Sequence, residues 1–314
     1  MEDQQSNHKW LAVINPNAGH GKGEKDWYLI AELLVKYNIN FEARFTQFKK
    51  HAIDIAKDGI KEGYRQLIAI GGDGTMNEVI NGCFMQNFCQ TTEITVSMIT
   101  VGTGNDWGKM FGIPVDYEGA IKLISANNSI LQDAGMVYYY HGNNREYRYF
   151  INIAGLGFDA LVVRRTNLQK EKGRKGKLLY FWNLLTSLLS YKFTRTEVII
   201  DGKRISEKIF TISLGIGKYS GGGMMQTPNA LADDGLFDIT IIKKISKGNV
   251  IRSLKMLYDG TILEHPLTLG FTGRDIQIDS DPLIHVEADG ETLGHSPIEF
   301  TIVPRCINVI YNKN

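Results

Sequence analysis

Three glycines surround a single aspartate directly after an apolar run in the stretch QLIAIGGDGTMNEVI, residues 66–80. The pattern predicts a buried strand, QLIAI, then a tight turn and a helix for which Thr75 is a suitable N-cap. Glycines at the end of a strand let main-chain N–H groups approach a phosphate, and the positive end of the next helix adds to the attraction. A carboxylate such as Asp73 would repel phosphates unless a divalent cation lay between them, so the stretch also indicates Mg²⁺. A tight turn with no ligand remains the alternative for these residues alone.

Two further glycine-rich loops follow predicted strands. They are NPNAGHGKG, residues 15–23, and TVGTGND, residues 100–106. The first loop is not a Walker A motif, because Pro16 occupies the position of that motif's first glycine and Gly23 replaces the Ser or Thr that holds the metal. Its glycines are spaced by twos, so it is not the dinucleotide motif GxGxxG either. Because the first loop matches neither motif, any nucleotide must be held in a different way. Three glycine-rich loops now follow three predicted strands.

The elements that must position these loops change in character along the chain. Up to about residue 130, short apolar runs alternate with helix-period segments, which is typical of βαβ units and predicts an α/β fold with a parallel sheet. Later strand-like runs are joined by turn signals, with Asp201 and Gly202 as the turn of a tight hairpin, so the second part is predicted to be mostly β. We expect two closely packed domains with a ligand cleft between them. Their predicted bounds are 1–134 and 135–303, with 304–314 as a last segment able to return to the first.

The composition of the 314 residues is that of an ordinary globular protein, with 43% hydrophobic and 22% charged residues. A net charge of +1 gives no overall attraction to nucleic acid, so no nucleic-acid partner is expected. Cys83, Cys89 and Cys306 are too few and too irregularly spaced for a disulfide framework or a zinc site. The first ten residues lack the pattern of a signal peptide, and no apolar run approaches the ~18 residues of a membrane span. These features predict a cytoplasmic protein, either soluble or peripherally associated with a membrane.

Seven motifs occur in a fixed order along the chain. They are NPNAGHGKG, GGDGTMNEV, GTGNDWGKMFGIP, QDAG, YFINIAGLGFDA, SGGGMMQTPNALADDGLFDI and EADGE. Together they resemble the diacylglycerol kinase catalytic family, which includes bacterial soluble lipid kinases and sphingosine kinases. The resemblance spans about residues 9 to 304. It implies a Rossmann-like parallel sheet of NAD kinase or diacylglycerol kinase type, a C-terminal β-sandwich, and an ATP-dependent lipid kinase.

The resemblance implies a nucleotide site in the first domain. The matching residues are Asn15, Pro16, Lys22, Gly71, Gly72, Gly74, Thr75, Gly102, Thr103 and Asn105. Asp73, also implied to be catalytic, and Asp133 of QDAG match two carboxylates that hold the Mg²⁺ through water, which suits a cation that keeps several waters. Some bacterial relatives have a lysine where this chain has His20, so the basic group at the phosphates is either His20 or Lys22.

Through the resemblance, the motif EADGE implies the residues that act on the hydroxyl group of the lipid substrate. Asp289 matches the proposed general base of the family, with Glu291 nearby. Without the resemblance, Asp-Gly at this point would indicate a hairpin turn. The motif ALADDGLFD implies a structural metal bound by the side chain of Asp234 and the main-chain carbonyls of Leu231 and Leu236.

A lipid substrate requires access to a bilayer, and residues 164–193 are the candidate membrane-facing element. The segment holds a basic cluster followed by an apolar stretch with three consecutive aromatic residues. These are Arg164, Arg165, Lys170, Lys172, Arg174, Lys175 and Lys177, then Tyr180, Phe181 and Trp182. Both features are typical of contact with an anionic membrane surface. The alternative is a helix packed on the second domain, because Leu178, Trp182, Leu185 and Leu189 fall near helical spacing on one face.

Other functions remain open at this stage. A soluble-substrate kinase of NAD kinase type also uses a GGDGT loop, and a phosphate loop does not choose the acceptor. A catalytically idle nucleotide- or lipid-binding regulator is the third hypothesis, although Asp73, Asp133 and Asp289 are all present. The predicted partners are a lipid substrate and, transiently, a membrane surface, and a homodimer is an option for the assembly.

Overall fold

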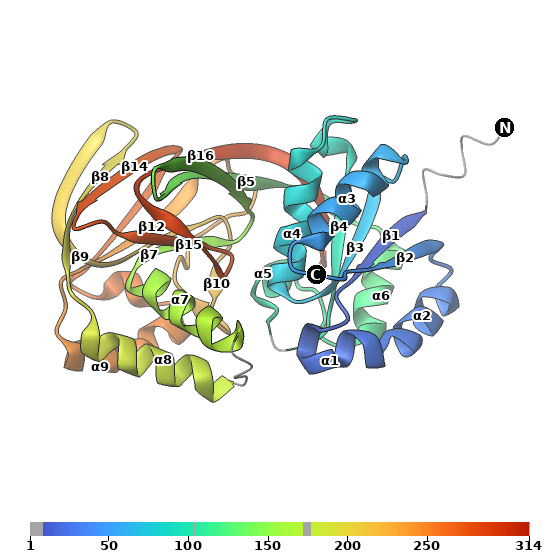
Figure 1. Ribbon diagram of the computed structural model, residues 1–314, viewed down its shortest axis with the longest axis horizontal. Coiled ribbons are helices and arrows are strands. Elements are labelled where there is room, and N and C mark those ends of the chain that lie inside the picture. The colour runs from blue at the N-terminus through green and yellow to red at the C-terminus, as the bar shows by residue number, and fades with distance from the viewer. Residues whose placement is uncertain (1–8, 103, 172–176, 314) are drawn as a thin grey trace. The chain divides into compact units, whose positions relative to one another are not determined.

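The computed structural model describes residues 9–102, 104–171 and 177–313, and within them the side chains outside 170–181 (Figure 1). The chain divides into two compact units. Unit 1 comprises Met1–Ala134 and Pro304–Asn314, and unit 2 comprises Gly135–Val303.

Unit 1 is built on a parallel sheet. Its strands are, in order, β2 (Phe41–Phe45), β1 (Trp10–Ile14), β3 (Gln66–Gly71), β4 (Thr95–Thr100) and the last residues of β16 (Glu291–Ile310). The central strands β1, β3 and β4 are buried almost throughout, which is why they read as continuous apolar runs. The helices are α1 (Ala18–Lys25), α2 (Trp27–Lys36), α3 (His51–Lys61), α4 (Asp73–Met85), η2 (Thr91–Glu93), α5 (Asp106–Met110) and α6 (Tyr117–Ala126). The predicted α/β fold of the first part is confirmed.

Unit 2 is mostly β, as predicted. With most of β16 and the part of β5 (Ser129–His141) from Gly135 on, its strands are β6 (Asn144–Phe150), β7 (Ile153–Gly157), β8 (Thr194–Ile200), β9 (Lys203–Gly215), β10 (Tyr219–Ser220), β11 (Met224–Met225), β12 (Phe237–Lys243), β13 (Thr268–Gly273), β14 (Asp275–Asp281) and β15 (His285–Ala288). The helices are α7 (Phe158–Glu171), α8 (Lys177–Ser190), α9 (Lys247–Asp259) and η3 (Ile262–Glu264). The hairpin predicted at Asp201 and Gly202 joins β8 to β9, and both residues have the positive φ that such a turn requires.

Strand pairing in unit 2 closes into a ring. From β9 the pairs pass through β7, β15, β16, β14 and β8 and return to β9. The long strands β9 and β16 allow this closure, because each pairs with different neighbours along its two halves. The predicted β-sandwich is therefore corrected to a barrel-like arrangement, since two separate sheets would not share strands.

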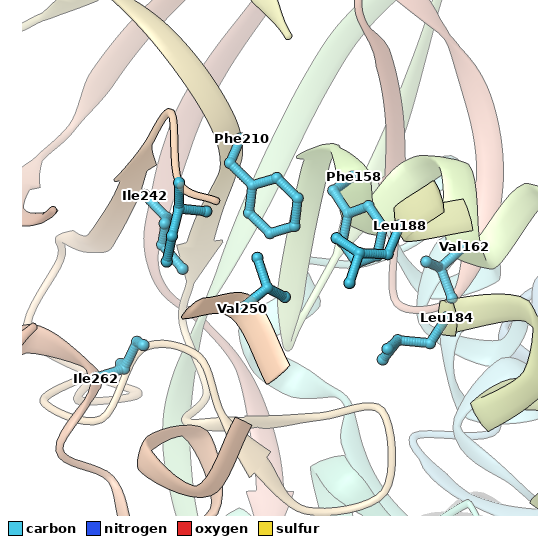
Figure 2. Packing of buried hydrophobic residues seen from close by; sticks show 9 residues of the cluster. Phe158, Val162, Leu184, Leu188, Phe210, Ile242, Val250 and Ile262 are labelled. Atoms are coloured by element: carbon cyan, nitrogen blue, oxygen red, sulfur yellow. The ribbon is translucent and has the colours of Figure 1, made fainter. Parts of the chain in front are cut away.

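Helices α7, α8 and α9 pack with β9 and β12 around an apolar cluster, part of which is shown in Figure 2. The rings of Phe158 and Phe210 stack at its centre, with centroids 4.5 Å apart. From α8 the cluster takes Leu184 and Leu188, which are almost fully buried.

The face of α8 that packs inward is not the predicted one. Trp182 and Leu189 are 64% and 70% exposed, so the prediction that they lie on the packed face was wrong. Polar contacts with α7 select the neighbouring face, because Asn183 donates to the Thr166 hydroxyl and Arg165 donates to the Ser187 hydroxyl. Leu185 is partly buried against the cluster, and the side chain of Leu178 lies outside the described residues.

The three cysteines are free thiols, and Cys83 and Cys306 are buried. Within the described part of the chain, the helices are too short or too polar to cross a membrane.

Candidate functional site

Three loops meet at the carboxyl ends of β1, β3 and β4. These strands are parallel neighbours, so the residues that follow them gather at one edge of the sheet. The N–H of Asn15, just after β1, donates to the carbonyl of Ile70. The N–H of Val101, just after β4, donates to the carbonyl of Gly71. The first and third loops are thus both tied to the end of the central strand.

Glycine allows the first and third loops to touch. A Cβ atom on Gly19 would lie 3.0 Å from the carbonyl oxygen of Val101, and one on Gly102 would lie 3.0 Å from the Cα of Gly19. Both glycines also have positive φ, +57° and +128°. A larger residue at either position would force the two loops apart.

A side-chain hydrogen bond joins the first loop to the second. Asn15 Nδ2 donates to Thr75 Oγ1 at 3.2 Å, and Asn15 Oδ1 accepts the N–H of Asn17 at 3.1 Å. Thr75 is buried in the first turn of α4, whose N-cap is Gly72. The prediction of Thr75 as the N-cap was therefore wrong. The helix starts earlier, at Asp73, because Gly72 already has the extended conformation of a cap residue.

Asp73 joins the second loop to the third. Its two carboxylate oxygens accept the main-chain N–H groups of Asp106 and Trp107, each at 3.2 Å. The negative charge therefore lies at the start of α5 and stabilises it. A Cβ atom on Gly104 would lie 3.0 Å from Asp73 Oδ2, so glycine also keeps this approach open.

Asp133 is completely buried in unit 1. Its Oδ1 accepts the N–H of Arg305 at 2.6 Å and so fixes the chain where β16 approaches β4. The neighbouring side chain of Gln132 accepts the indole N–H of Trp107 at 3.1 Å. Because the main-chain N–H of Trp107 donates to Asp73, one buried tryptophan links the surroundings of the two predicted metal-site carboxylates.

The carboxylates of Asp73 and Asp133 supply the oxygen ligands that Mg²⁺ prefers, and an ion that keeps its waters does not need both in direct contact. Among the residues that the structure describes, no three His, Cys, Asp or Glu side chains gather as direct metal ligands. The two carboxylates offer oxygen ligands of the kind that suits a magnesium ion that keeps its waters.

The remaining predicted nucleotide-binding residues lie on the same three loops. Asn105 Oδ1 accepts the hydroxyl of Thr100 at 2.8 Å, which holds the third loop against the end of β4. Pro16 and Gly74 are half-buried, whereas His20, Lys22 and Gly102 are exposed. Exposure thus does not distinguish His20 from Lys22 as the phosphate contact. Thr103 lies outside the described residues.

In unit 2, Asp289 and Gly290 form the tight turn between β15 and β16, with φ of +49° and +80°. The Asp289 carboxylate accepts three main-chain N–H groups, from Ile151 and Asn152 at 3.0 Å and from Ile153 at 3.2 Å. The hairpin turn indicated by Asp-Gly is confirmed. The same bonds fix the orientation of the carboxylate that the resemblance implies as the base. Glu291, half-buried, opens β16.

The residues predicted for a structural metal lie in the turn before β12. Asp234 Oδ1 accepts the N–H of Leu236 at 3.0 Å, and Asp234 and Leu231 are exposed. Burial, together with the charge of Asp234, raises the pKa of Asp238 to about 6. The carboxylate of Asp234 is thus near a second acid, and the metal site itself stays a prediction.

A cavity of about 700 Å³, counting the space that opens to solvent, lies within unit 2. Its apolar lining comes mainly from α7, α9, β9 and β12. The apolar residues are Phe158, Val162, Leu184, Phe210, Met224, Ile242, Ile245, Val250, Leu254, Leu257 and Ile262. Figure 2 shows Phe158, Phe210 and Val250 pointing toward one another from three elements.

Asp159 forms a polar end of this cavity. Gln226 Nε2 donates to its Oδ2 at 2.9 Å, and the hydroxyl of Ser213 lies 3.5 Å from the same oxygen. Desolvation raises the pKa of Asp159 to about 6, although hydrogen bonds from Thr211, Ser213 and Gln226 act in the opposite direction. An apolar cavity with a few convergent polar groups and a perturbed acid is a candidate binding site.

Two family models match the chain. The "Diacylglycerol kinase catalytic domain" matches residues 9–137, and the "YegS C-terminal NAD kinase beta sandwich-like domain" matches residues 152–311. A diacylglycerol kinase of Staphylococcus aureus (strain JH9) is 30% identical over 297 residues, which cover 95% of this chain and 90% of the relative. The chain belongs to the diacylglycerol kinase family. The diacylglycerol kinase of Staphylococcus carnosus is 27% identical over 96% of this chain and 94% of its own.

Solved structures agree with this family at the level of the fold. A crystal structure of a diacylglycerol kinase from Bacillus anthracis has a TM-score of 0.72 at 21% identity, covering 98% of this chain and 97% of that chain. Yeast NADH kinase in complex with NADH has a TM-score of 0.54 at 13% identity, covering 98% and 85%. Membership of the diacylglycerol kinase family implies a kinase that uses ATP and typically a divalent metal.

The sequence analysis did not identify Asp159, Glu287 or Gln226 as candidate site residues of this member of the diacylglycerol kinase family. Asp159 lies in the motif YFINIAGLGFDA and Glu287 in the motif EADGE, both beside apolar residues in the sequence. For both acids, the available signal in the sequence was a carboxyl side chain flanked by apolar, strand-like residues. No local pattern could have shown that Gln226 approaches Asp159, because the two are 67 residues apart.

Proposed function

We propose that this protein is an ATP-dependent lipid kinase that transfers the γ-phosphoryl group to a hydroxyl of a lipid such as diacylglycerol. The observation that carries the choice of a lipid is the cavity of unit 2, because its apolar lining suits an acyl chain. The names of the relatives support the same choice. A dinucleotide acceptor would leave this apolar surface unmatched.

In the proposed site, a Rossmann-like unit 1 binds the phosphates of ATP along the three loops. Glycine at positions 71, 72 and 74 and the start of α4 bring main-chain N–H groups to the phosphates. Phosphoryl transfer asks little covalent chemistry of the protein, so positioning and charge stabilisation supply most of the rate. Asp73 and Asp133 would hold the waters of a Mg²⁺ ion, which when bound neutralises phosphate charge.

Asp289 is the proposed general base. It orients the acceptor hydroxyl and takes its proton while the lipid oxygen bonds to the γ-phosphorus and the bond to the bridging oxygen of ADP breaks. Its three main-chain hydrogen bonds hold the carboxylate in one orientation, which is what a positioned base requires. Glu291 lies two residues further along and adds negative charge beside the turn.

We also propose transient contact with a membrane surface through the outer face of α8. Trp182 and Leu189 are exposed on this helix, and Arg164 is exposed on α7. An exposed tryptophan, a leucine and nearby cations are the groups that favour an anionic bilayer surface. The side chains of Tyr180, Phe181 and five basic residues of the predicted cluster lie outside the described residues.

A substrate screen tests the proposed function. Purified protein is incubated with labelled ATP, Mg²⁺ and, separately, diacylglycerol, phosphatidylglycerol, sphingosine, ceramide or NAD. Transfer to at least one lipid is expected. Transfer to NAD alone would select the NAD kinase type, and transfer to none would select a regulator.

A further inference from the structure

Glu287 is a buried acid in β15, and other acids lie near it. It is 5% exposed, and the acids close enough to affect it are Asp159 from α7, Asp289 from the turn and Glu291 from β16. A carboxylate in this place would lose its hydration and be repelled by these acids, against one main-chain hydrogen bond from Gly290. Burial and these charges, Asp159 first among them, raise the pKa of Glu287 well above its ordinary value.

One oxygen of Glu287 holds the turn that carries Asp289. Glu287 Oε2 accepts the N–H of Gly290 at 2.9 Å. On the other side of the turn, Asn167 Nδ2 donates to the carbonyl of Gly290 at 3.0 Å. Both turn residues have the positive φ that a tight Asp-Gly hairpin turn requires.

The other oxygen of Glu287 lies beside Gly155 of β7, on the side of Asp159 in α7. A Cβ atom on Gly155 would lie 2.6 Å from Glu287 Oε1 and 3.1 Å from the Cβ of Asp159. Gly155 therefore leaves the space in which these two acids approach each other. Asp159 in turn lines the cavity beside Gln226. Glu287 thus lies between a cavity-lining acid and the turn of the proposed base.

We propose that Glu287 is a positioning residue for Asp289: as an uncharged hydrogen-bonding group it clamps the Asp289–Gly290 turn while separating that turn from Asp159. Only the expected effect of Glu287 on catalysis rests on the proposed function, because that effect requires Asp289 to be the base. A neutral Glu287 holds the Gly290 N–H without a third negative charge between two other acids. An ionised Glu287 would repel the Asp289 carboxylate and misplace the base.

Two substitutions separate this role from a catalytic carboxylate. Glu287→Gln keeps an uncharged acceptor for Gly290, so we expect kcat within about threefold of the wild type. Glu287→Ala removes the clamp, and kcat should fall roughly 10- to 100-fold with an unchanged KM for ATP, as for a slightly misplaced group. The control is Glu299→Gln, which changes an exposed acid of β16 paired with Arg145 and should leave kcat unchanged.

A steric variant provides an independent check. Gly155→Ala places a methyl group against Glu287 Oε1 and should lower kcat in the wild-type background. In the Glu287→Ala background the same change should lower kcat much less, because its main clash has gone. Equal losses in both backgrounds would contradict the clamp. So would a Gln variant as inactive as the Ala variant, or an Ala variant as active as the wild type.

The charge state of Glu287 is measured without any substrate. The ¹³C shift of its carboxyl carbon, assigned by its disappearance in Glu287→Gln, should be that of a protonated acid at neutral pH. An ionised Glu287 would overturn the inference. If the wild-type protein phosphorylates no lipid, the proposed function fails, whereas this shift still decides whether Glu287 is an uncharged clamp.

Discussion

Asp289 shows how one side chain serves both a turn and the proposed chemistry. Its carboxylate is fixed by three main-chain N–H groups, which the amide of asparagine can match only in part. We expect Asp289→Asn to lower kcat by about 10² to 10⁴ fold, since that is the usual contribution of a positioned base. The dissociation constant for ATP, measured by calorimetry, should be unchanged. The control Asp279→Asn alters an exposed acid of the same unit, and equal losses in both variants would contradict the assignment.

Asp159 should make the stability of the protein depend on pH. Its pKa is raised in the folded state to about 6, so the folded protein binds the proton more tightly than the unfolded chain. Its effect is therefore absent at acidic pH and becomes a growing destabilisation as pH rises through about 6. Asp159→Asn should thus gain stability relative to the wild type as pH rises, by up to about 3 kcal/mol. Denaturant unfolding of both proteins across this pH range checks the sign, and a constant difference would contradict it.

At the scale of elements, Gly82 sets how closely α3 and α4 pack. A Cβ atom on Gly82 would lie 2.6 Å from both the Cβ of Ala56 and the carbonyl oxygen of Ile53. We expect Gly82→Ala to destabilise the protein by roughly 1–3 kcal/mol despite the better helix propensity of alanine. The matched control is Gly248→Ala in α9, where a Cβ meets nothing within 4 Å and a gain of about 0.4–1 kcal/mol is expected. Thermal unfolding of the two variants should therefore shift in opposite directions.

The two faces of α8 should respond differently to substitution. Trp182→Ser with Leu189→Ser changes exposed residues, so the melting temperature should change little while binding to anionic vesicles weakens. Leu188→Ala opens the apolar cluster and should cost about 2–5 kcal/mol. Vesicle co-sedimentation and thermal unfolding measure the two effects. Undiminished vesicle binding by the double variant would remove α8 from the proposed membrane surface.

At the scale of the whole molecule, the chain's last residues belong to unit 1. Ile307, Val309 and Ile310 are fully buried, and Asn308 and Val309 pair with β4. Burial of each such side chain contributes roughly 1.5–3 kcal/mol, and Asp133 also loses the N–H of Arg305 if the segment is removed. A chain ending at Val303 should therefore melt at a lower temperature and bind Mg-ADP more weakly. A chain ending at Asn312 is the control, and unchanged melting of the shorter chain would contradict the role of the segment.

Local sequence patterns were enough to predict the α/β part and its three glycine-rich loops. Buried strands of a parallel sheet are apolar on both faces, and glycines directly after them indicate close approach of main chain, so the α/β part and its three loops could be predicted. The hairpin at Asp201 and Gly202 followed from turn chemistry alone. The start of α4 was misplaced because a glycine cap has no side chain to reveal it.

The tertiary structure decided what depends on residues distant in the chain. Closure of the strand ring required β9 and β16 to change partners along their length, which no periodicity shows. The inward face of α8 depended on polar contacts with α7. The carboxyl pair of Asp159 and Glu287, 128 positions apart, formed because Gly155 leaves room for both. The sequence alone determined where the three glycine-rich loops follow the strands, because glycine content and strand pattern are local features. Which acids meet, and so in which direction their pKa values move, follows only from packing, because desolvation and repulsion depend on neighbours in space.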